Sequence, residues 1–116
     1  MVLKLNHKNL EAYKVSRQLL QACYRTTALF PQEERYLLVQ QIRRAALSVK
    51  LNLAEGSSRR SIIERKRFFE ISRGSLIEID AAIESAFDLS YISEADINSL
   101  AVLLNRCFAL LSGMVK

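Results

Sequence analysis

The stretch from Asn52 to Glu84, NLAEGSSRRSIIERKRFFEISRGSLIEIDAAIE, decides the fold because it ends one helix and starts the longest one. Gly56 stands where a helix commonly ends, since glycine adopts the left-handed conformation without a Cβ penalty. Ser61 and Glu64 have the spacing of a capping box, in which a Ser hydroxyl and a Glu carboxylate satisfy free backbone N–H groups at a helix start. Helical periodicity then continues to about Leu89 with no intervening proline. The stretch therefore predicts two helices joined by a short turn.

Helical periodicity also covers most of the remaining chain. Asn9 is a good N-cap for a first helix, and Pro31 can serve as the first residue of the second. Ser93 and Asp96 resemble another capping box, with Asp in place of Glu. The predicted helices span residues 9–29, 31–55, 61–89 and 94–114. Because the connections are short, we predict an all-α protein, a single domain over residues 1–116 folded as an antiparallel up-down-up-down four-helix bundle.

Composition supports this class of fold and bounds the function. Half of the 116 residues are hydrophobic, with only three Gly and one Pro, as in a helical domain with short loops. Two cysteines, Cys23 and Cys107, without a signal-peptide pattern indicate reduced thiols. No apolar run approaches the roughly 20 residues of a membrane span. We expect a cytoplasmic protein with no membrane partner.

The chain has more apolar residues than one small bundle needs to bury. Leu47 and Leu51 form a second ridge on the helix over 31–55, and Ile77 falls on the polar side of the next helix. The helix over 94–114 has an apolar arc covering about half its circumference. We therefore predict a homo-oligomer with Leu47, Leu51 and Ile77 in its interface. The small residues Ser72, Gly74 and Ser75 predict close approach of another helix.

Charge is distributed unevenly along the chain. Residues 43–73 carry nine basic side chains against three acidic ones, whereas residues 74–105 carry six acids and no base. One interpretation is an ordinary solvated surface with weak helix ion pairs. The other is a surface that contacts nucleic-acid phosphates, although no aromatic residues interleave the basic ones along the sequence. The predicted phosphate contacts are Arg43, Arg44, Lys50, Arg59, Arg60, Lys66, Arg67 and Arg73.

Enzyme chemistry finds no support in the sequence. His7 is the only histidine, and no Cys or acidic cluster has metal-ligand spacing. Gly-rich phosphate loops, nucleophile elbows and zincin motifs are absent from the sequence. We expect a protein that is not an enzyme, with no catalytic residues, metal or cofactor.

A structural role is predicted for the residues around the turn. Arg65 falls inside the apolar arc, where an unpaired charge is costly, and Glu55 is the nearest acid across the turn. We therefore predict a partly buried Glu55–Arg65 ion pair, with Asn52 bonding the backbone of the turn. The predicted structural residues are Asn52, Glu55, Gly56, Ser61, Glu64 and Arg65.

Several short motifs recur at consistent spacing along nearly the whole chain. They are Phe30-Pro31, Glu34-Arg35, Gln41-Ile-Arg-Arg-Ala45, Asn52-Leu-Ala-Glu-Gly56, Arg60-Ser61, Phe68-Phe69, Arg73-Gly-Ser75 and Glu78. With these motifs the chain resembles the small four-helix-bundle proteins encoded within intervening sequences of bacterial 23S ribosomal RNA genes. The resemblance implies an up-and-down bundle that assembles into pentameric rings. A related accessory protein of diversity-generating retroelements uses a basic surface of this kind to bind nucleic acid and a reverse transcriptase.

The favoured function is a non-catalytic, oligomeric nucleic-acid-binding protein, with structured RNA as the expected ligand. The alternative is a structural or protein-interaction module whose basic surface meets an acidic protein. The sequence leaves both open.

Overall fold

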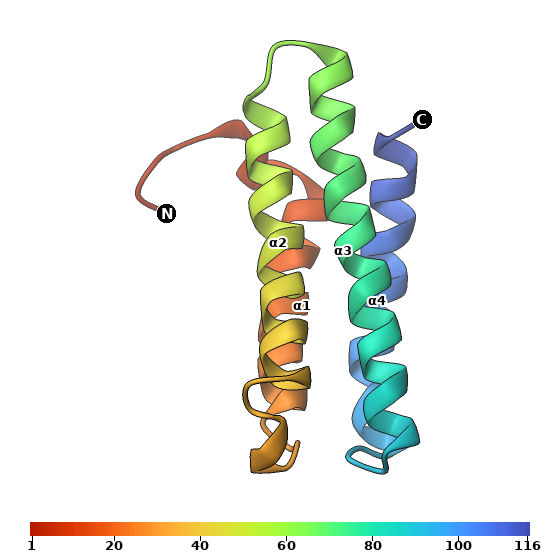
Figure 1. The fold of residues 1–116 in the computed structure, drawn as a ribbon. Coiled ribbons are helices and arrows are strands. Elements are labelled where there is room, and N and C mark those ends of the chain that lie inside the picture. Colours follow the sequence, from red (N-terminus) through yellow and green to blue (C-terminus); the bar gives the residue numbers. More distant parts are fainter.

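Four antiparallel α-helices form an elongated bundle of 44 × 30 × 22 Å in the computed structural model, which describes all 116 residues. The helices are α1 (Glu11–Thr27), α2 (Leu38–Ser58), α3 (Ile62–Asp88) and α4 (Glu94–Met114), with 3₁₀ turns η1 (Asn6–Asn9) and η2 (Gln32–Glu34). Each helix packs against the next one in sequence, and α1 packs against α4 to close the bundle (Figure 1). The predicted all-α four-helix bundle is confirmed.

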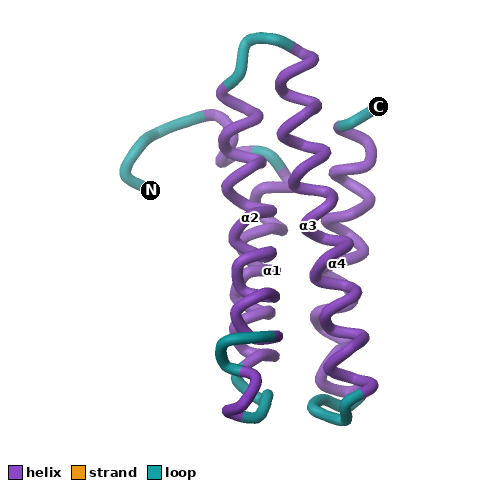
Figure 2. Tube along the Cα trace, in the orientation of Figure 1, coloured by secondary structure: helices purple, strands orange, loops and turns teal.

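The ends of the bundle differ in their connections. The α2–α3 turn lies at one end, together with the C-terminus, whereas the α1–α2 and α3–α4 connections lie at the other (Figure 2). Nearly all the rest of the chain is helical, so the exposed loops are short. We call the end with the α2–α3 turn the turn end.

Large apolar side chains from all four helices meet in one core. The seven largest fully buried side chains are Leu19, Ile42, Leu53, Leu76, Ile79, Leu100 and Leu111. Cys23 and Cys107 are also fully buried and free, and burial raises the pKa of each thiol to about 12. This burial gives both cysteines a structural role, because a reactive cysteine needs a thiolate.

Small polar residues line the seam between α2 and α3. The buried Ser72 hydroxyl donates to the Val49 carbonyl at 2.7 Å, and the Ser75 hydroxyl donates to the Ser48 hydroxyl at 2.9 Å. These two helices have the most extensive contact of any pair in the molecule. The prediction of close approach at Ser72 and Ser75 is confirmed, and buried hydroxyls are tolerated here because each has a hydrogen-bond partner.

The predicted roles of Gly56 and Gly74 were both wrong. Gly56 does not end α2 in the left-handed conformation, since no glycine has a positive φ and α2 continues to Ser58. A Cβ at Gly56 would instead lie 2.8 Å from Cε1 of Phe69 and 2.9 Å from Cβ of Phe68. Gly74, predicted to allow close packing, is exposed and has nothing within 4 Å of a Cβ position. The close approach of α2 and α3 therefore depends on Gly56.

Two helix starts also differ from the predictions. Asn9 lies in η1 rather than capping α1, which begins at Glu11 after Leu10 with no side-chain cap. α2 begins at Leu38, because Pro31 is extended and η2 follows it. The Leu38 N–H donates to Oε2 of Glu34 at 3.4 Å, so η2 supplies the acceptor that a helix start needs.

α4 is the most apolar helix and the least covered. Its capping box is complete, with Ser93 and Asp96 each accepting a backbone N–H of the other, as predicted. Contrary to the expectation from apolar runs, α4 is long and apolar enough to cross a membrane, with a mean hydropathy of 1.4. Only 17% of this apolar 18-residue stretch of α4 is buried, and Val102 in α4 is 67% exposed. Core helices of other proteins can have the same length and hydropathy. In α4 the polar residues Asn105 and Arg106 interrupt the apolar sequence.

Candidate nucleic-acid interface

Basic side chains gather at the turn end because the α2–α3 connection is only three residues long. Ser61 begins α3 with its hydroxyl accepting the Glu64 N–H at 3.3 Å, although the Glu64 carboxylate does not return the bond, so half of the predicted capping box is present. The short turn leaves the flanking cations pointing outward. Arg60, Arg65 and Arg67 are exposed, and Lys66 is half-buried. We call Arg60, Arg65, Lys66 and Arg67 the basic tip.

The predicted Glu55–Arg65 ion pair is wrong. Glu55 pairs instead with Arg59, four residues further on, at 2.7 Å, and both side chains are about half exposed. Arg65 is exposed and has no carboxylate within 4.0 Å, since the chain contains only the Glu55–Arg59 and Glu11–Arg106 pairs. The reason is that α2 runs one turn further than predicted, which places Glu55 inside the helix beside Arg59. Arg65 therefore joins the basic tip.

Asn52 serves its own helix rather than the turn. Its amide donates to the Ser48 carbonyl at 2.9 Å and to the Ser48 hydroxyl at 3.0 Å. These bonds contradict the predicted contact with the turn backbone. Because Ser48 also accepts the Ser75 hydroxyl, Asn52 extends the polar seam between α2 and α3.

Four of the predicted phosphate contacts are engaged within the fold. Arg43 donates to Oγ1 of Thr27 at 2.9 Å and stacks over the Tyr24 ring at 4.3 Å. Arg73 donates to the Ser112 hydroxyl at 2.8 Å and lies 4.4 Å from the centre of the Phe108 ring. Cations over rings are worth on the order of 0.5–1 kcal/mol at exposed sites. Lys50 lies over Tyr13 and Arg59 over Phe68, at 5.9 and 4.9 Å.

The predicted phosphate contacts do not form one patch. Arg43 and Arg44 lie 16 residues before Arg59 and Arg60, in α2 or just beyond its end. At 1.5 Å per residue that separation is about 24 Å along the helix axis. Arg44 is exposed near the opposite end of α2. Basic side chains thus occur at both ends of α2, and the basic tip is the denser group.

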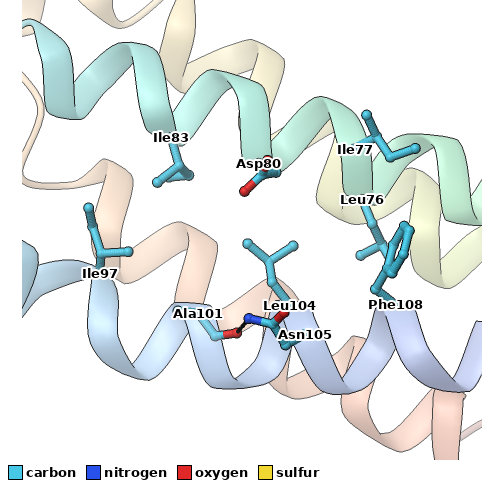
Figure 3. Close-up of a pocket in the computed structure, with 9 residues that line it drawn as sticks. All are labelled: Leu76, Ile77, Asp80, Ile83, Ile97, Ala101, Leu104, Asn105 and Phe108. Carbon is cyan, nitrogen blue, oxygen red and sulfur yellow. Dashed lines mark hydrogen bonds between the residues drawn. The ribbon is translucent and has the colours of Figure 1, made fainter.

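The predicted interface residues are all exposed. Leu47, Leu51 and Ile77 have exposed fractions of 40%, 50% and 52%. Ile77 also lines a mainly apolar groove of about 300 Å³ between α3 and α4. Leu104 and Phe108 point into this groove from α4 (Figure 3). A groove of this composition fits an apolar side chain of a partner.

Sequence reasoning missed two sets of exposed residues. Ile62 and Ile63, 69% and 83% exposed, open α3 in the middle of the basic tip. Tyr36 is 78% exposed just before α2, at the other end of the bundle. The capping Ser61 could have revealed the first set, because residues directly after an N-cap at an exposed turn have little to pack against.

No group of three or more His, Cys, Asp and Glu side chains could hold a metal ion. The lone His7 packs edge-on against the Tyr13 ring, with centroids 4.7 Å apart. This contact gives His7 a packing role beside α1.

Comparison with known families covers nearly all of this structure. The family described as 23S rRNA-intervening sequence protein matches residues 8–113. The chain belongs to that family. The match to the 23S rRNA-intervening sequence protein family runs from the end of η1 almost to the end of α4, so the residues of the basic tip and of the α3–α4 groove lie within the matched part of the chain. The family resemblance inferred from the sequence motifs is confirmed. A search of curated proteins finds no match to the chain.

Proposed function

We propose that this member of the 23S rRNA-intervening sequence protein family is a non-catalytic protein that binds structured RNA through the basic tip. The observation that carries the proposal is the set of unpaired cations at one end of the molecule. Arg60, Arg65 and Arg67 are exposed, and no carboxylate lies within 4.0 Å of any of them. Free guanidinium groups are the side chains that pair best with phosphate oxygens.

The local backbone supports anion binding at the same place. α3 begins at Ile62, so its N-terminal N–H groups and positive helix dipole lie among the cations of the basic tip. Only Glu64 opposes them within the first turn. Arg59 adds charge nearby, although its pairing with Glu55 reduces its contribution. RNA is favoured over other polyanions because the family is named for an intervening sequence of 23S rRNA.

We further propose that the chain self-associates through its exposed apolar side chains. Ile77 and Val102, on the two helices that form the groove, are 52% and 67% exposed, and Leu47 and Leu51 form a separate ridge on α2. Exposed apolar patches commonly mark protein–protein contacts. A pentameric ring, as implied by the resemblance, and a link to the retroelement accessory protein are part of this proposal.

The test is the salt dependence of RNA binding. Each phosphate contact releases counterions, so log affinity should fall linearly with log salt, with a slope of about 0.7–0.9 per contact. The triple variant Arg60→Gln, Arg65→Gln, Arg67→Gln should lower that slope by about 2 to 3. Filter binding with a structured RNA and with a DNA duplex would measure the slopes and the preference.

A matched control removes the same charge elsewhere. Lys14, Arg17 and Arg25 are exposed cations of α1. Replacing all three by Gln changes the net charge equally but should leave the slope nearly unchanged. Equal losses of slope in both triple variants would mean that net charge alone attracts the RNA, and would overturn the assignment to the basic tip.

The alternative, an acidic protein partner, is favoured by one observation. Ile62 and Ile63 are exposed within the basic tip, and an apolar pair ringed by cations fits a protein surface that is both acidic and apolar. Failure of the wild-type protein to bind either RNA or DNA at low salt would leave this alternative as the better explanation of the tip.

A further inference from the structure

A second group of basic and aromatic residues lies at the end of α2 opposite the basic tip. Tyr24, Tyr36, Arg35, Arg43 and Arg44 line one open depression of about 360 Å³ at the α1–α2 connection. These residues come from α1, from the segment after η2 and from α2, and the fold brings them together. We call this group the tyrosine–arginine surface.

The two tyrosine rings differ in what covers them. Arg43 stacks over the Tyr24 ring at 4.3 Å and is held there by hydrogen bonds to the Thr27 hydroxyl and the Tyr24 carbonyl. The guanidinium of Arg35 lies over the Tyr36 ring at 6.0 Å from its centre, but Tyr36 is still 78% exposed, so most of its ring surface is open to solvent. Tyr36 therefore presents a large flat apolar ring to solvent with cations beside it.

The Tyr36 ring also borders a second depression. Tyr36 and Arg44 line both the first depression and a neighbouring one of about 350 Å³, so both residues stand between two concave surfaces. Arg44 is exposed and has no carboxylate within 4.0 Å. A ring with hollows beside it can receive a flat ligand, and the neighbouring guanidinium groups can hold an attached anion.

The nearest acids leave this surface open to an anion. Glu34 turns its carboxylate toward other groups, since it accepts the Tyr91 hydroxyl at 3.2 Å and the Leu38 N–H at 3.4 Å. Glu78 accepts the Gln41 amide at 3.2 Å. Glu33 is exposed in η2 and makes no ion pair with the surface. Arg35 and Arg44 thus remain available for phosphate.

Unpaired nucleotides are flat aromatic ligands with attached phosphates. Bases in a duplex are already stacked on their neighbours, whereas bases in loops, bulges and overhangs can stack on a Tyr ring. We propose that the tyrosine–arginine surface binds unpaired nucleotides, with a base stacked on Tyr36 and phosphates against Arg35 and Arg44. This inference rests on the proposed RNA binding and adds a second contact at the opposite end of α2, whose 21 residues span about 32 Å at 1.5 Å per residue.

The test compares one RNA hairpin with and without a single-stranded overhang. The wild-type chain should bind the overhang form more tightly. Tyr36→Ala should remove that preference, a loss of about 5- to 100-fold, because stacking energies are of this size. Tyr36→Phe should retain it, since the ring is kept. Tyr36→Ala should leave the salt slope unchanged, whereas Arg44→Gln should lower it by about 1.

Fluorescence gives an independent readout. The chain contains four Tyr and no Trp, so its emission is tyrosine emission. Adding the overhang RNA should quench the wild-type protein more than Tyr36→Phe, because stacking quenches the stacked ring. Tyr36 is exposed, so these variants should keep the wild-type melting temperature.

The outcomes separate the two proposals. Wild-type protein that binds neither hairpin would refute RNA binding itself. Wild-type protein that binds both hairpins equally, or a Tyr36→Ala variant that still prefers the overhang, would refute only the tyrosine–arginine surface. A Tyr36→Ala variant that loses self-association in sedimentation would also refute it, because Tyr36 would then belong to a contact between chains.

Discussion

The two sides of α3 use opposite means of packing. Toward α2, the helix presents the buried hydroxyls of Ser72 and Ser75, and the phenyl ring of Phe69 packs against the Cα of Gly56. Toward α4, it presents large apolar side chains and leaves a groove of about 300 Å³. The more polar contact is thus the closer one, because small side chains let two helices approach until their hydroxyls reach the facing backbone. Hydrophobicity alone would have indicated a closer contact between α3 and α4 than between α2 and α3.

This difference separates what fixes the fold from what remains for partners. The close contact between α2 and α3 begins near the basic tip, since Gly56 lies just before the turn and Ser72 lies further along α3. α4 closes the bundle while keeping apolar residues such as Val102 on its outer side. Three substitutions test the contrast, from the largest expected effect on the free energy of unfolding to the smallest.

The largest effect is expected at the close approach. Gly56→Ala places a Cβ within 2.8 Å of the Phe69 ring and 2.9 Å of Phe68 Cβ, so the helices must move apart. Overpacking of this kind costs about 1–3 kcal/mol. Urea unfolding followed by circular dichroism would measure the loss.

Gly74→Ala is the matched control for that experiment. The new methyl group has nothing within 4 Å, and alanine favours the helix by about 1 kcal/mol over glycine. Stabilisation by Gly74→Ala and destabilisation by Gly56→Ala would sharpen the comparison. Shifts of the same sign in both variants would show that close packing is not the role of Gly56.

An intermediate effect is expected where α4 is capped. Ser93→Ala removes the hydroxyl that accepts the Asp96 N–H, and losing such an N-cap costs about 1 kcal/mol. Hydrogen bonds from the Ser93 backbone N–H and then from its hydroxyl lower the pKa of Asp96 below its usual 3.8. The lowered pKa means that the ionised cap stabilises the fold above pH 3.8 and loses this contribution as the pH falls through the folded-state value.

The difference in melting temperature between wild type and Ser93→Ala should therefore narrow in acid. Thermal unfolding at pH 7 and at a pH well below 3.8 would measure it. A difference that stays constant over this range would contradict the coupling between Ser93 and the Asp96 charge.

The smallest effect on unfolding is expected at the groove. Ile77→Gln replaces a side chain that is 52% exposed, so the free energy of unfolding of the dissociated chain should change by less than about 0.5 kcal/mol. Self-association should weaken markedly, as measured by sedimentation equilibrium. Ile63→Gln, an identical exchange at the basic tip, should leave association intact. Equal weakening by both would remove the groove from the interface.

The sequence predicted those features that depend on neighbouring residues. The Ser93–Asp96 box and the close approach at Ser72 and Ser75 follow from local spacing and helical periodicity, and both are present, whereas the Ser61–Glu64 box is only half formed. Gly56 was misread because a glycine near a helix end can indicate either a left-handed cap or a close contact, and only the position of Phe69 distinguishes the two.

Features that depend on where a helix ends, or on how the chain reverses between helices, could not be predicted. Arg65 was assigned a partner by its place on a helical wheel, yet a helix end that shifted by three residues paired Glu55 with Arg59. The tyrosine–arginine surface could not be predicted from the sequence for a similar reason. Tyr24 and Tyr36 lie 12 residues apart in the sequence and meet only because the chain reverses between α1 and α2.

The separation of charge between the two ends has a consequence for how the molecule meets its ligands. Cations without acidic partners crowd the turn end, whereas at the far end of a molecule 44 Å long Asp88, Glu94 and Asp96 lie around the α3–α4 connection, at the same end as the arginines of the tyrosine–arginine surface. The acids at the far end offset its arginines, so we expect the turn end to be the more positive end of the molecule. In the field of a polyanion we therefore expect the molecule to turn before contact, with the α2–α3 turn leading. Because salt screens this field beyond about 10 Å at 0.1 M, the rate of association should fall as the ionic strength rises.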